Sequence, residues 1–434
     1  MLPTTPLPLT LLFAAALVLS LAVKLWLATR QMRHVAAHRH KVPAAFEGQV
    51  TLPAHQRAAD YTLAKGRFGL LTMAFGSMLV LGWTLLGGLD ALNTLVRATL
   101  PAGTGPLAYQ LVLITVFALI GGALDLPFEL YATFRIEQQF GFNRNTWALY
   151  IADLLKGLLL GALIGLPLLA LVLWLMAATG AYWWLWAWGA WTAFQLGVMV
   201  AYPTLIAPLF NKFEPLTDEG LKTRVQSLMQ RCGFAAQGLF VMDGSRRSAH
   251  GNAYFTGLGA AKRVVFFDTL LAKLSAPEVV AVLAHELGHF KHKHVAQRMV
   301  MMCVFSLAGL ALLGWLARQP GFYLGLGVNP NLGAPNDALA LLLFMTALPV
   351  FGFFVSPLLA QLSRKQEFEA DAYASAQANA DDLASALLKL HKDNAATLTP
   401  DPLYVRFYYS HPPASERLAA LASLASLAPP TLAA

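Results

Sequence analysis

The sequence predicts an all-α protein that crosses a membrane several times. Of its 434 residues, 57% are hydrophobic and 12% are charged, whereas soluble domains carry about 25% charged residues. A helix needs about 20 apolar residues to cross a bilayer. Seven stretches meet this requirement: residues 7–29, 69–89, 107–124, 157–180, 182–210, 299–317 and 338–362. We therefore expect seven transmembrane helices.

The first stretch is expected to be a retained helix rather than a cleaved signal peptide. No Lys or Arg precedes it, and it runs on through Lys24, Leu25 and Trp26 into a basic segment. A signal peptide begins with a basic region and ends at small residues that are cleaved. The order of these features in this chain is different, so the helix counts as a span.

The basic residues predict the orientation of the spans. If the N-terminus lies outside, the inner segments hold 27 of the 31 Lys and Arg residues, and the outer loops hold only Arg97 and Arg318. Cytoplasmic loops carry this kind of excess. The net charge of +8 is then explained by basic cytoplasmic loops, which are attracted to anionic lipid headgroups. We expect the bilayer as a partner and no nucleic acid, because no nucleic-acid-binding motif is present.

The chain is expected to divide into four parts. Residues 1–210 hold spans one to five with a basic loop at 30–67, and residues 299–362 hold spans six and seven. Residues 211–298 and 363–434 are polar, and both are expected on the cytoplasmic side. These two polar parts would form one domain that is mainly α with a small β component.

The first polar part combines short strands with a helix. Gly238–Met242 and Arg263–Phe267 are rich in β-branched and aromatic residues, and Asn252–Phe255 is a weaker third candidate. The residues from Ser275 to Glu278 form a capping box with a proline in the first turn, which predicts that a helix begins there.

That helix carries His-Glu-Leu-Gly-His at positions 285–289. His285 and His289 are four residues apart, so both imidazoles project from one helical face and can bind one zinc ion. Glu286 lies beside them and can take a proton from a water molecule. The pattern is typical of zinc metalloproteases. The metzincin class is excluded, because it requires Gly and His where this chain has His292 and Val295.

The third zinc ligand is expected beyond spans six and seven. Glu367 and Asp371 lie one helical turn apart in a helix-compatible run, and we assign Glu367 as the ligand. Asp371 would hold a zinc-bound imidazole or pass a proton to the leaving amine. Glu369 is on another face and is expected at the surface. His292 and His294 are interpreted as structural. Without the upstream histidines, the same run would be an ordinary solvated acidic helix.

With these residues identified, the chain resembles the type I CAAX prenyl endopeptidases, which are integral membrane zinc proteases of the gluzincin type that trim C-terminally prenylated proteins. The likeness spans most of the chain. Beyond the two ligand motifs it includes Phe140–Asn143 with Asp153 and Lys156, Pro208–Leu216, Asp243–Ser245, Asn252–Gly257, Arg263–Leu271, Tyr409–Pro413, and Glu416 with Arg417.

The resemblance implies roles for the site residues. His285, His289 and Glu367 would hold one Zn²⁺, Glu286 would be the base, and Asp371 would be a proton donor or an anchor. These roles agree with those derived above from the residues.

Three further roles follow from the resemblance alone. Asn252 would lie on the strand that pairs with the substrate, His411 would stabilise the oxyanion, and Arg417 would hold the carboxylates. Alternatively, His411 belongs to an ordinary loop turn and Arg417 to a surface pair.

The resemblance also implies a fold and a cellular location. The family's fold is a ring of seven tilted helices around a hydrated chamber, capped on the cytoplasmic side by the catalytic domain. This chain departs from the family pattern at His250 and Gly251, and its tail has no dibasic retention signal. The tail and the Ala/Leu-rich composition predict a bacterial version in the inner membrane. Because a bacterial cell need not contain prenylated proteins, the identity of the substrate stays open.

The predicted function is zinc-dependent hydrolysis of peptide bonds near the C-terminus of prenylated, or similar membrane-associated, proteins or peptides. One alternative is a heat-shock type quality-control protease, which the length and the span count disfavour. A site-2 type protease would bury the motif within a span, which the charged residues at 291–294 disfavour. A transporter or scaffold with a vestigial metal site is disfavoured by the intact Glu286 and the lack of an inverted repeat.

Overall fold

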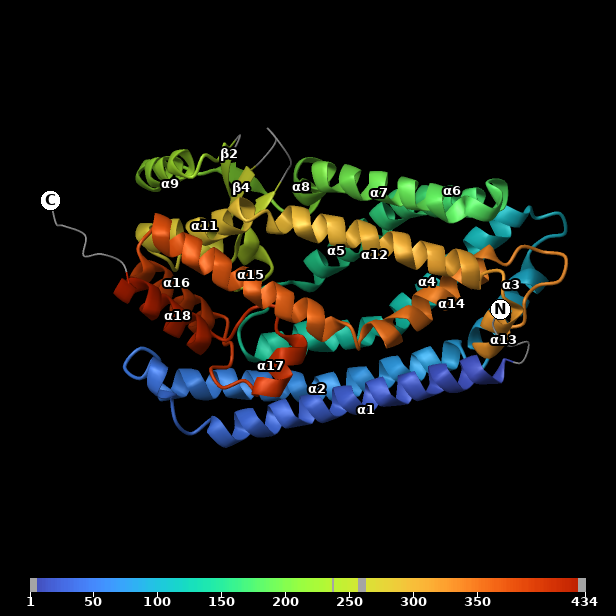
Figure 1. The fold of residues 1–434 in the computed structure, drawn as a ribbon, viewed down its shortest axis with the longest axis horizontal. Coiled ribbons are helices and arrows are strands. Elements are labelled where there is room, and N and C mark those ends of the chain that lie inside the picture. The colour runs from blue at the N-terminus through green and yellow to red at the C-terminus, as the bar shows by residue number, and fades with distance from the viewer. Residues whose placement is uncertain (1–5, 236–237, 257–262, 428–434) are drawn as a thin grey trace.

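The computed structural model describes residues 6–235, 238–256 and 263–427. Gly257, named in the sequence analysis, and the end of the tail at residues 428–434 lie outside the described residues. Long helices run side by side along the longest axis of the molecule, and the polar segments gather at one end with α9, α11, α16 and α18 (Figure 1). Helix α1 begins at the opposite end.

Six helical segments in the described part are long and apolar enough to cross a membrane. They are α1 (Leu7–His38), α2 (Leu52–Trp83), α4 with η2 (Pro106–Glu137), α5 to α6 (Trp147–Ala178), η4 to α8 (Gly180–Phe210) and α12 (His294–Leu316). A seventh is formed by α14 (Asp337–Gly352) and α15 (Ser356–Gln377), which meet at a bend of 64°. The expected seven spans are thus six continuous segments and one bent pair.

The bend in the seventh span has a local cause. Pro349 lies inside α14, and Pro357 lies in the first turn of α15. Proline lacks a backbone N–H and its ring clashes with the preceding turn, so it kinks or ends a helix. Because of the bend, α15 leaves the direction of the span and continues into the polar end of the molecule (Figure 1).

The expected basic loop at 30–67 is wrong for most of its length. Helix α1 continues to His38 and α2 already begins at Leu52. Hydropathy marks only the part of a helix that lies in hydrocarbon, whereas the helical hydrogen bonds continue equally well in water. For the same reason, α12 begins at His294 and α15 runs unbroken past the boundary expected at 362.

The extended end of α1 is tied to the C-terminal part of the chain. Arg30 Nε lies 3.0 and 2.9 Å from the two carboxylate oxygens of Asp401. Asp401 is 1% exposed and also accepts the backbone N–H groups of Leu403 and Tyr404 at the start of α17 (Pro402–Tyr408). The first span therefore anchors the segment that leads to the last helix.

The spans pack against one another over only part of their length. The largest buried hydrophobic cluster joins α1, α4, α6 (Leu166–Ala178) and α14 through residues such as Phe13, Leu113, Leu173 and Leu339. In the most apolar stretch of each of the six segments, between 0 and 33% of the residues are buried. This low burial is compatible with the expected chamber between the helices, which stays a prediction.

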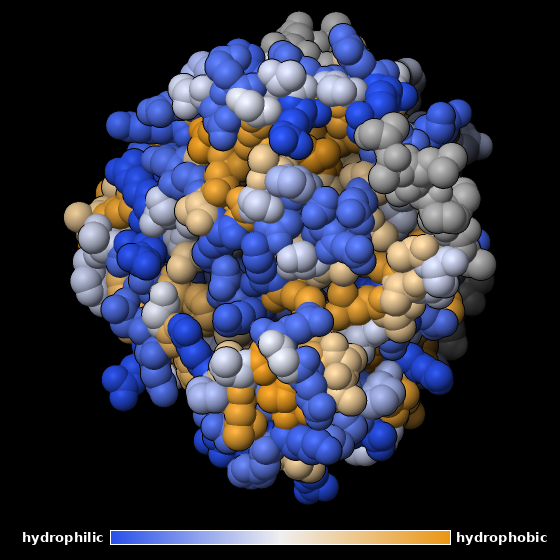
Figure 2. All heavy atoms as spheres, turned by 90° about the vertical axis from the view of Figure 1, so that its left-hand side faces the viewer, coloured by the Kyte–Doolittle hydropathy of each residue, from blue (hydrophilic) through white to orange (hydrophobic). Residues whose placement is uncertain are grey.

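The remaining helices connect the spans or build the polar end. Outside it, α3 (Gly88–Thr99) and α13 (Pro320–Gly325) connect spans, whereas α7 (Trp183–Ala201) and α8 (Ala207–Phe210) are parts of the fifth spanning segment. Those of the polar end are α9 (Glu219–Arg231), α10 (Asp268–Leu271), α11 (Ala276–Lys291), α16 (Ala380–Asp393) and α18 (Ala414–Leu427). This end is covered largely by hydrophilic residues, with hydrophobic patches between them (Figure 2).

A four-stranded sheet supports the polar end, in the order β1-β2-β4-β3. Strands β2 (Gly238–Met242) and β4 (Arg263–Phe267) have the expected bounds and pair in parallel. Strand β3 (Ala253–Thr256) lies within one residue of the weaker candidate and pairs antiparallel with β4. The short β1 (Phe213–Pro215) was not expected. Because β3 is at the edge of the sheet, no strand in the described part of the chain pairs with its outer side.

Helix α11 begins as the capping box predicts. The backbone N–H of Ser275 donates to the carboxylate of Glu278, and the side chain of Ser275 accepts the backbone N–H of Glu278. Val279, Leu283 and Leu287 recur every four residues, are each 1% exposed, and belong to the core shared with the sheet, α9 and α16. This packing fixes which face of α11 turns away from the core.

The backbones of α11 and α15 touch at Gly288. A Cβ atom at this position would lie 2.8 Å from Ala370 Cα and 3.0 Å from the Ala370 carbonyl oxygen. No side chain can move aside here, because both neighbours are backbone atoms. The glycine in the middle of the motif is therefore required for the two helices to approach this closely.

We predict that Gly288→Ala destabilises the protein by about 1 to 3 kcal/mol, the range typical of overpacking. The measurement is thermal unfolding in detergent. Gly309→Ala in α12 is the matched control, because a Cβ at that position would meet only Phe344 at 4.0 Å. An unchanged melting temperature for Gly288→Ala would show that the helices are not in backbone contact.

Candidate active site

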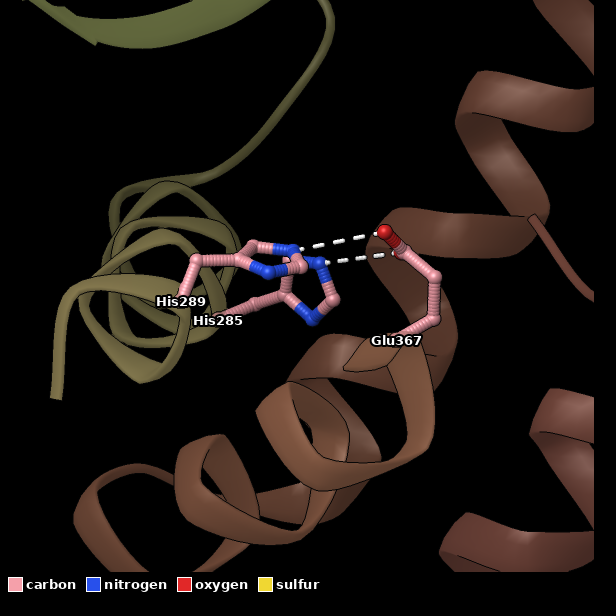
Figure 3. Close-up of side chains that lie close together, drawn as sticks. All are labelled: His285, His289 and Glu367. Carbon is pink, nitrogen blue, oxygen red and sulfur yellow. Dashed lines mark ion pairs between the residues drawn. The ribbon is translucent and has the colours of Figure 1, made fainter. Parts of the chain in front are cut away.

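The three expected ligands come together between α11 and α15. One ligand atom from each of His285, His289 and Glu367 lies within 4.8 Å of the others. Glu367 Oε2 is 3.4 Å from His285 Nε2, and Glu367 Oε1 is 3.3 Å from His289 Nε2. The two imidazoles and the carboxylate point toward one another from the two helices (Figure 3).

The arrangement fits a divalent metal ion. Two ligand atoms at about 2.05 Å from one ion, at tetrahedral angles, are about 3.3 Å apart, which matches both measured distances. Glu367 is 1% exposed, and no hydrogen-bond partner for its Oε2 atom is present among the described residues. A buried carboxylate oxygen without a partner is costly. A cation bound between these side chains would remove that cost.

Asp371 and Arg417 hold His285 in the orientation that a metal needs. His285 Nδ1 lies 2.8 Å from Asp371 Oδ1, so Nδ1 donates and Nε2 is left facing Glu367. Arg417 donates to both oxygens of Asp371, at 2.8 and 2.6 Å. Asp371 and Arg417 are 0% and 7% exposed. Arg417 is therefore a buried partner of the site and not part of a surface pair.

His289 is held in the same way by His294, which the sequence analysis interpreted as structural, and by Glu369, which is only partly exposed and not simply at the surface as expected. Its Nδ1 lies 2.9 Å from His294 Nδ1, and His294 Nε2 lies 2.9 Å from Glu369 Oε2. If Nε2 of His289 faces the metal, its Nδ1–H donates to His294, which in turn donates to Glu369. Nothing local in the sequence indicates this chain of hydrogen bonds. It forms because Lys293 adopts a left-handed conformation (φ 58°), and His294, which is 1% exposed, turns back toward α11.

Glu286 lies beside the ligands, where two cavities meet. Burial raises the pKa of Glu286, although the nearby His285 and His289 act in the opposite direction. Glu286 and His289 line both a cavity of about 490 Å³ and a second cavity of about 670 Å³. A carboxylate whose pKa is raised is a stronger base, so Glu286, at the meeting point of two cavities, is suited to accept a proton.

The remaining expected residues line the first cavity. His411 Nε2 is 3.4 Å from Glu367 Oε1, and its side chain is 66% exposed, so it lies at the rim of the site. Asn252 directly precedes β3, and its side-chain oxygen accepts the N–H of Ala253. Asp371 is not among the residues that line this cavity. The structure thus brings His411 and Asn252 to the cavity and places Asp371 behind the ligands.

In comparisons with known proteins, the N-terminal membrane part and the remaining part of the chain match two different family models. Residues 31–212 match a family model described as CAAX prenyl protease N-terminal, five membrane helices, and residues 215–425 match peptidase family M48. The chain is 34% identical over 412 residues to a CAAX prenyl protease 1 homolog of Oryza sativa subsp. japonica, covering 90% of this chain and 92% of that protein. The chain belongs to the CAAX prenyl protease 1 family.

Other members of the family are similarly related. The identity is 32% to CAAX prenyl protease 1 of Saccharomyces cerevisiae, with 88% of each chain covered. It is also 32% to the homolog of Homo sapiens, with 95% of this chain and 96% of that protein covered. The crystal structure of S. mikatae Ste24p superposes with a TM-score of 0.89 at 30% identity, covering 95% of this chain and 99% of that chain.

Membership of this family confirms two predictions from the sequence. The chain is a metallopeptidase, because it belongs to peptidase family M48 and its His-His-Glu group can hold a metal. It is also an integral, multi-pass membrane protein, because the matched N-terminal part is a five-helix membrane domain and further spans follow. The transporter or scaffold alternative is therefore not supported.

We predict that His294→Ala weakens metal retention about 10- to 100-fold, the usual effect of losing a residue that orients a metal ligand. The measurement is the metal content after dialysis against graded chelator concentrations. His292→Ala is the matched control, because His292 is exposed and two residues away. Equal retention in the two variants would contradict the role of His294.

Metal affinity should fall as the pH falls. Burial alone would lower the pKa of His285, but its hydrogen bonds with Asp371 and Glu367 raise the pKa to about 9 in the metal-free site. Below pH 9 the ring therefore carries a proton that the metal must displace, and the affinity should drop about tenfold for each pH unit down to neutrality. Competition with a chelator of known pH dependence measures this slope. A flat profile between pH 7 and 9 would contradict it.

Proposed function

We propose that this chain is a zinc-dependent endopeptidase that hydrolyses peptide bonds near the C-terminus of prenylated, CAAX-type membrane-associated proteins. The observation that carries the proposal is the His285, His289 and Glu367 group, which lies beside a sheet edge in a membrane-spanning protein. The substrate class follows from the names of the relatives, which are CAAX prenyl proteases.

Zinc is the proposed metal because the donors are two imidazole nitrogens and one carboxylate, with room for a further ligand in the cavity. When bound by His285, His289 and Glu367, zinc would polarise the scissile carbonyl and lower the pKa of the attacking water. The protein's own groups supply the remaining chemistry.

Glu286 is the proposed base and proton carrier. It lies at the meeting point of the two cavities, and its raised pKa lets it accept the proton of the water and return it to the leaving amine. Asp371 is completely buried and holds both His285 and Arg417. We therefore propose Asp371 as the anchor of His285 and not as the proton donor.

The substrate peptide would bind in an extended conformation along β3. Among the described residues, no strand pairs with the outer edge of β3, and its first residue, Ala253, lines the first cavity together with Asn252 and Glu286. A peptide can add to such an edge by main-chain hydrogen bonds. Asn252 would contact the peptide at the start of the strand, and His411, at the rim, would donate a hydrogen bond to the oxyanion.

The proposed orientation places the catalytic end in the cytoplasm. This follows from the excess of Lys and Arg in the segments at that end. The relatives named above are eukaryotic, and the bacterial inner membrane stays a prediction from the composition and the tail.

The test is cleavage of a farnesylated CaaX peptide by the full-length protein in liposomes. We predict that Glu286→Gln lowers kcat about 10²- to 10⁴-fold, because it removes the proton acceptor, while the bound metal is retained. Removal of the metal with a chelator should abolish activity, and added zinc should restore it. Full activity of Glu286→Gln would contradict the mechanism. Cleavage of an unmodified membrane protein, without cleavage of the prenylated peptide, would favour the heat-shock type alternative.

A further inference from the structure

The second cavity beside Glu286 and His289 is larger and more apolar than the cavity that holds His411. Its volume is about 670 Å³, and its walls come from the sheet edge, the catalytic helix and two membrane helices. Its apolar lining includes Met199, Tyr254, Phe255, Phe290, Val295 and Met299. Lys291 and Lys293, both exposed, also line it where α11 passes into α12.

This cavity continues into the membrane region. Met199 and Met299 also line a further cavity of about 440 Å³ between α7 and α12, which includes Met302 and Cys303. Val295, Met299 and Met302 follow one face of α12 at helical spacing, and seven residues of helix span about 10 Å. We call this continuous feature the α7–α12 groove. It leads from the catalytic carboxylate along two membrane spans.

The edge strand connects the two sides of the site. Asn252 and Ala253 line the first cavity, whereas Tyr254 and Phe255 line the second. A peptide extended along β3 therefore passes from one cavity to the other across Glu286. The residue on one side of the scissile bond faces a cavity with polar groups such as Asn394 and Arg298, and the residue on the other side faces the α7–α12 groove.

We propose that the α7–α12 groove binds the isoprenoid chain of the substrate. A chain attached next to the scissile bond must begin at the reacting atoms, which is where the groove begins. The groove then leads between two spans, so the chain can remain in apolar surroundings. Methionine side chains are flexible and polarisable, and they adapt to a long, irregular apolar ligand. The inference rests on the proposed function, because it requires a prenylated substrate.

The decisive experiment maps where the isoprenoid lies. The full-length Glu286→Gln variant is incubated with a CaaX peptide whose isoprenoid ends in a photoreactive benzophenone, and the adducts are located by mass spectrometry. We expect adducts at Met199, Met299 or Met302. Adducts only at residues of the first cavity, or only at exposed positions on other spans such as Met345, would overturn the proposal.

A kinetic experiment provides a second measurement. Met299→Trp fills the groove, so its kcat/KM for a farnesylated peptide should fall about tenfold more than its kcat/KM for the same peptide carrying an S-methyl group. Met345→Trp is the control, because this side chain is 70% exposed on α14. Equal losses of kcat/KM for the two peptides would contradict the proposal that the α7–α12 groove binds the isoprenoid chain. If the wild-type protein cleaves neither peptide, the proposed function itself fails, whereas farnesyl cleavage with adducts elsewhere refutes only the groove.

Discussion

The backbone contact between α11 and α15 is the constraint on which the rest of the site depends. Two of the three metal ligands lie on one helix and the third on the other, and a glutamate side chain is short. The ligand atoms approach to 3.3 and 3.4 Å because Gly288 lets the two backbones touch at Ala370. Since α15 is the second half of the bent seventh span, the metal ligands can come together only when the membrane helices have folded.

The site also contains a group of buried charged side chains that hold one another in place. His285, Glu367, Asp371 and Arg417 are all at most 7% exposed, and they come from α11, α15 and α18. Burying such charges is costly unless each one has its partner. The last helix of the polar end therefore belongs to the site, although it lies far along the chain from the catalytic motif. Arg417 offsets the negative charge of Asp371, which in turn orients His285.

The edge strand β3 would determine the orientation of a bound peptide. An unpaired sheet edge is usually a liability for a protein, because it can pair with other chains. In this protein the edge of β3 lies between a polar and an apolar cavity, and Glu286 lies at their junction. A peptide bound there would have its two ends in different surroundings, one close to water and one close to the membrane spans.

Features that depend on neighbouring residues could be predicted from the sequence alone. These are the apolar spans, the capping box at Ser275, strands β2 and β4, and the histidine pair, because periodicity and capping are local. Hydropathy missed the helical extensions at 30–67, since helices continue outside hydrocarbon. The position of β3 at the edge of the sheet, and the support of His289 by His294 and Glu369, became visible only in the folded molecule. These features rest on the turn at Lys293 and on contacts between distant helices, which no local pattern encodes.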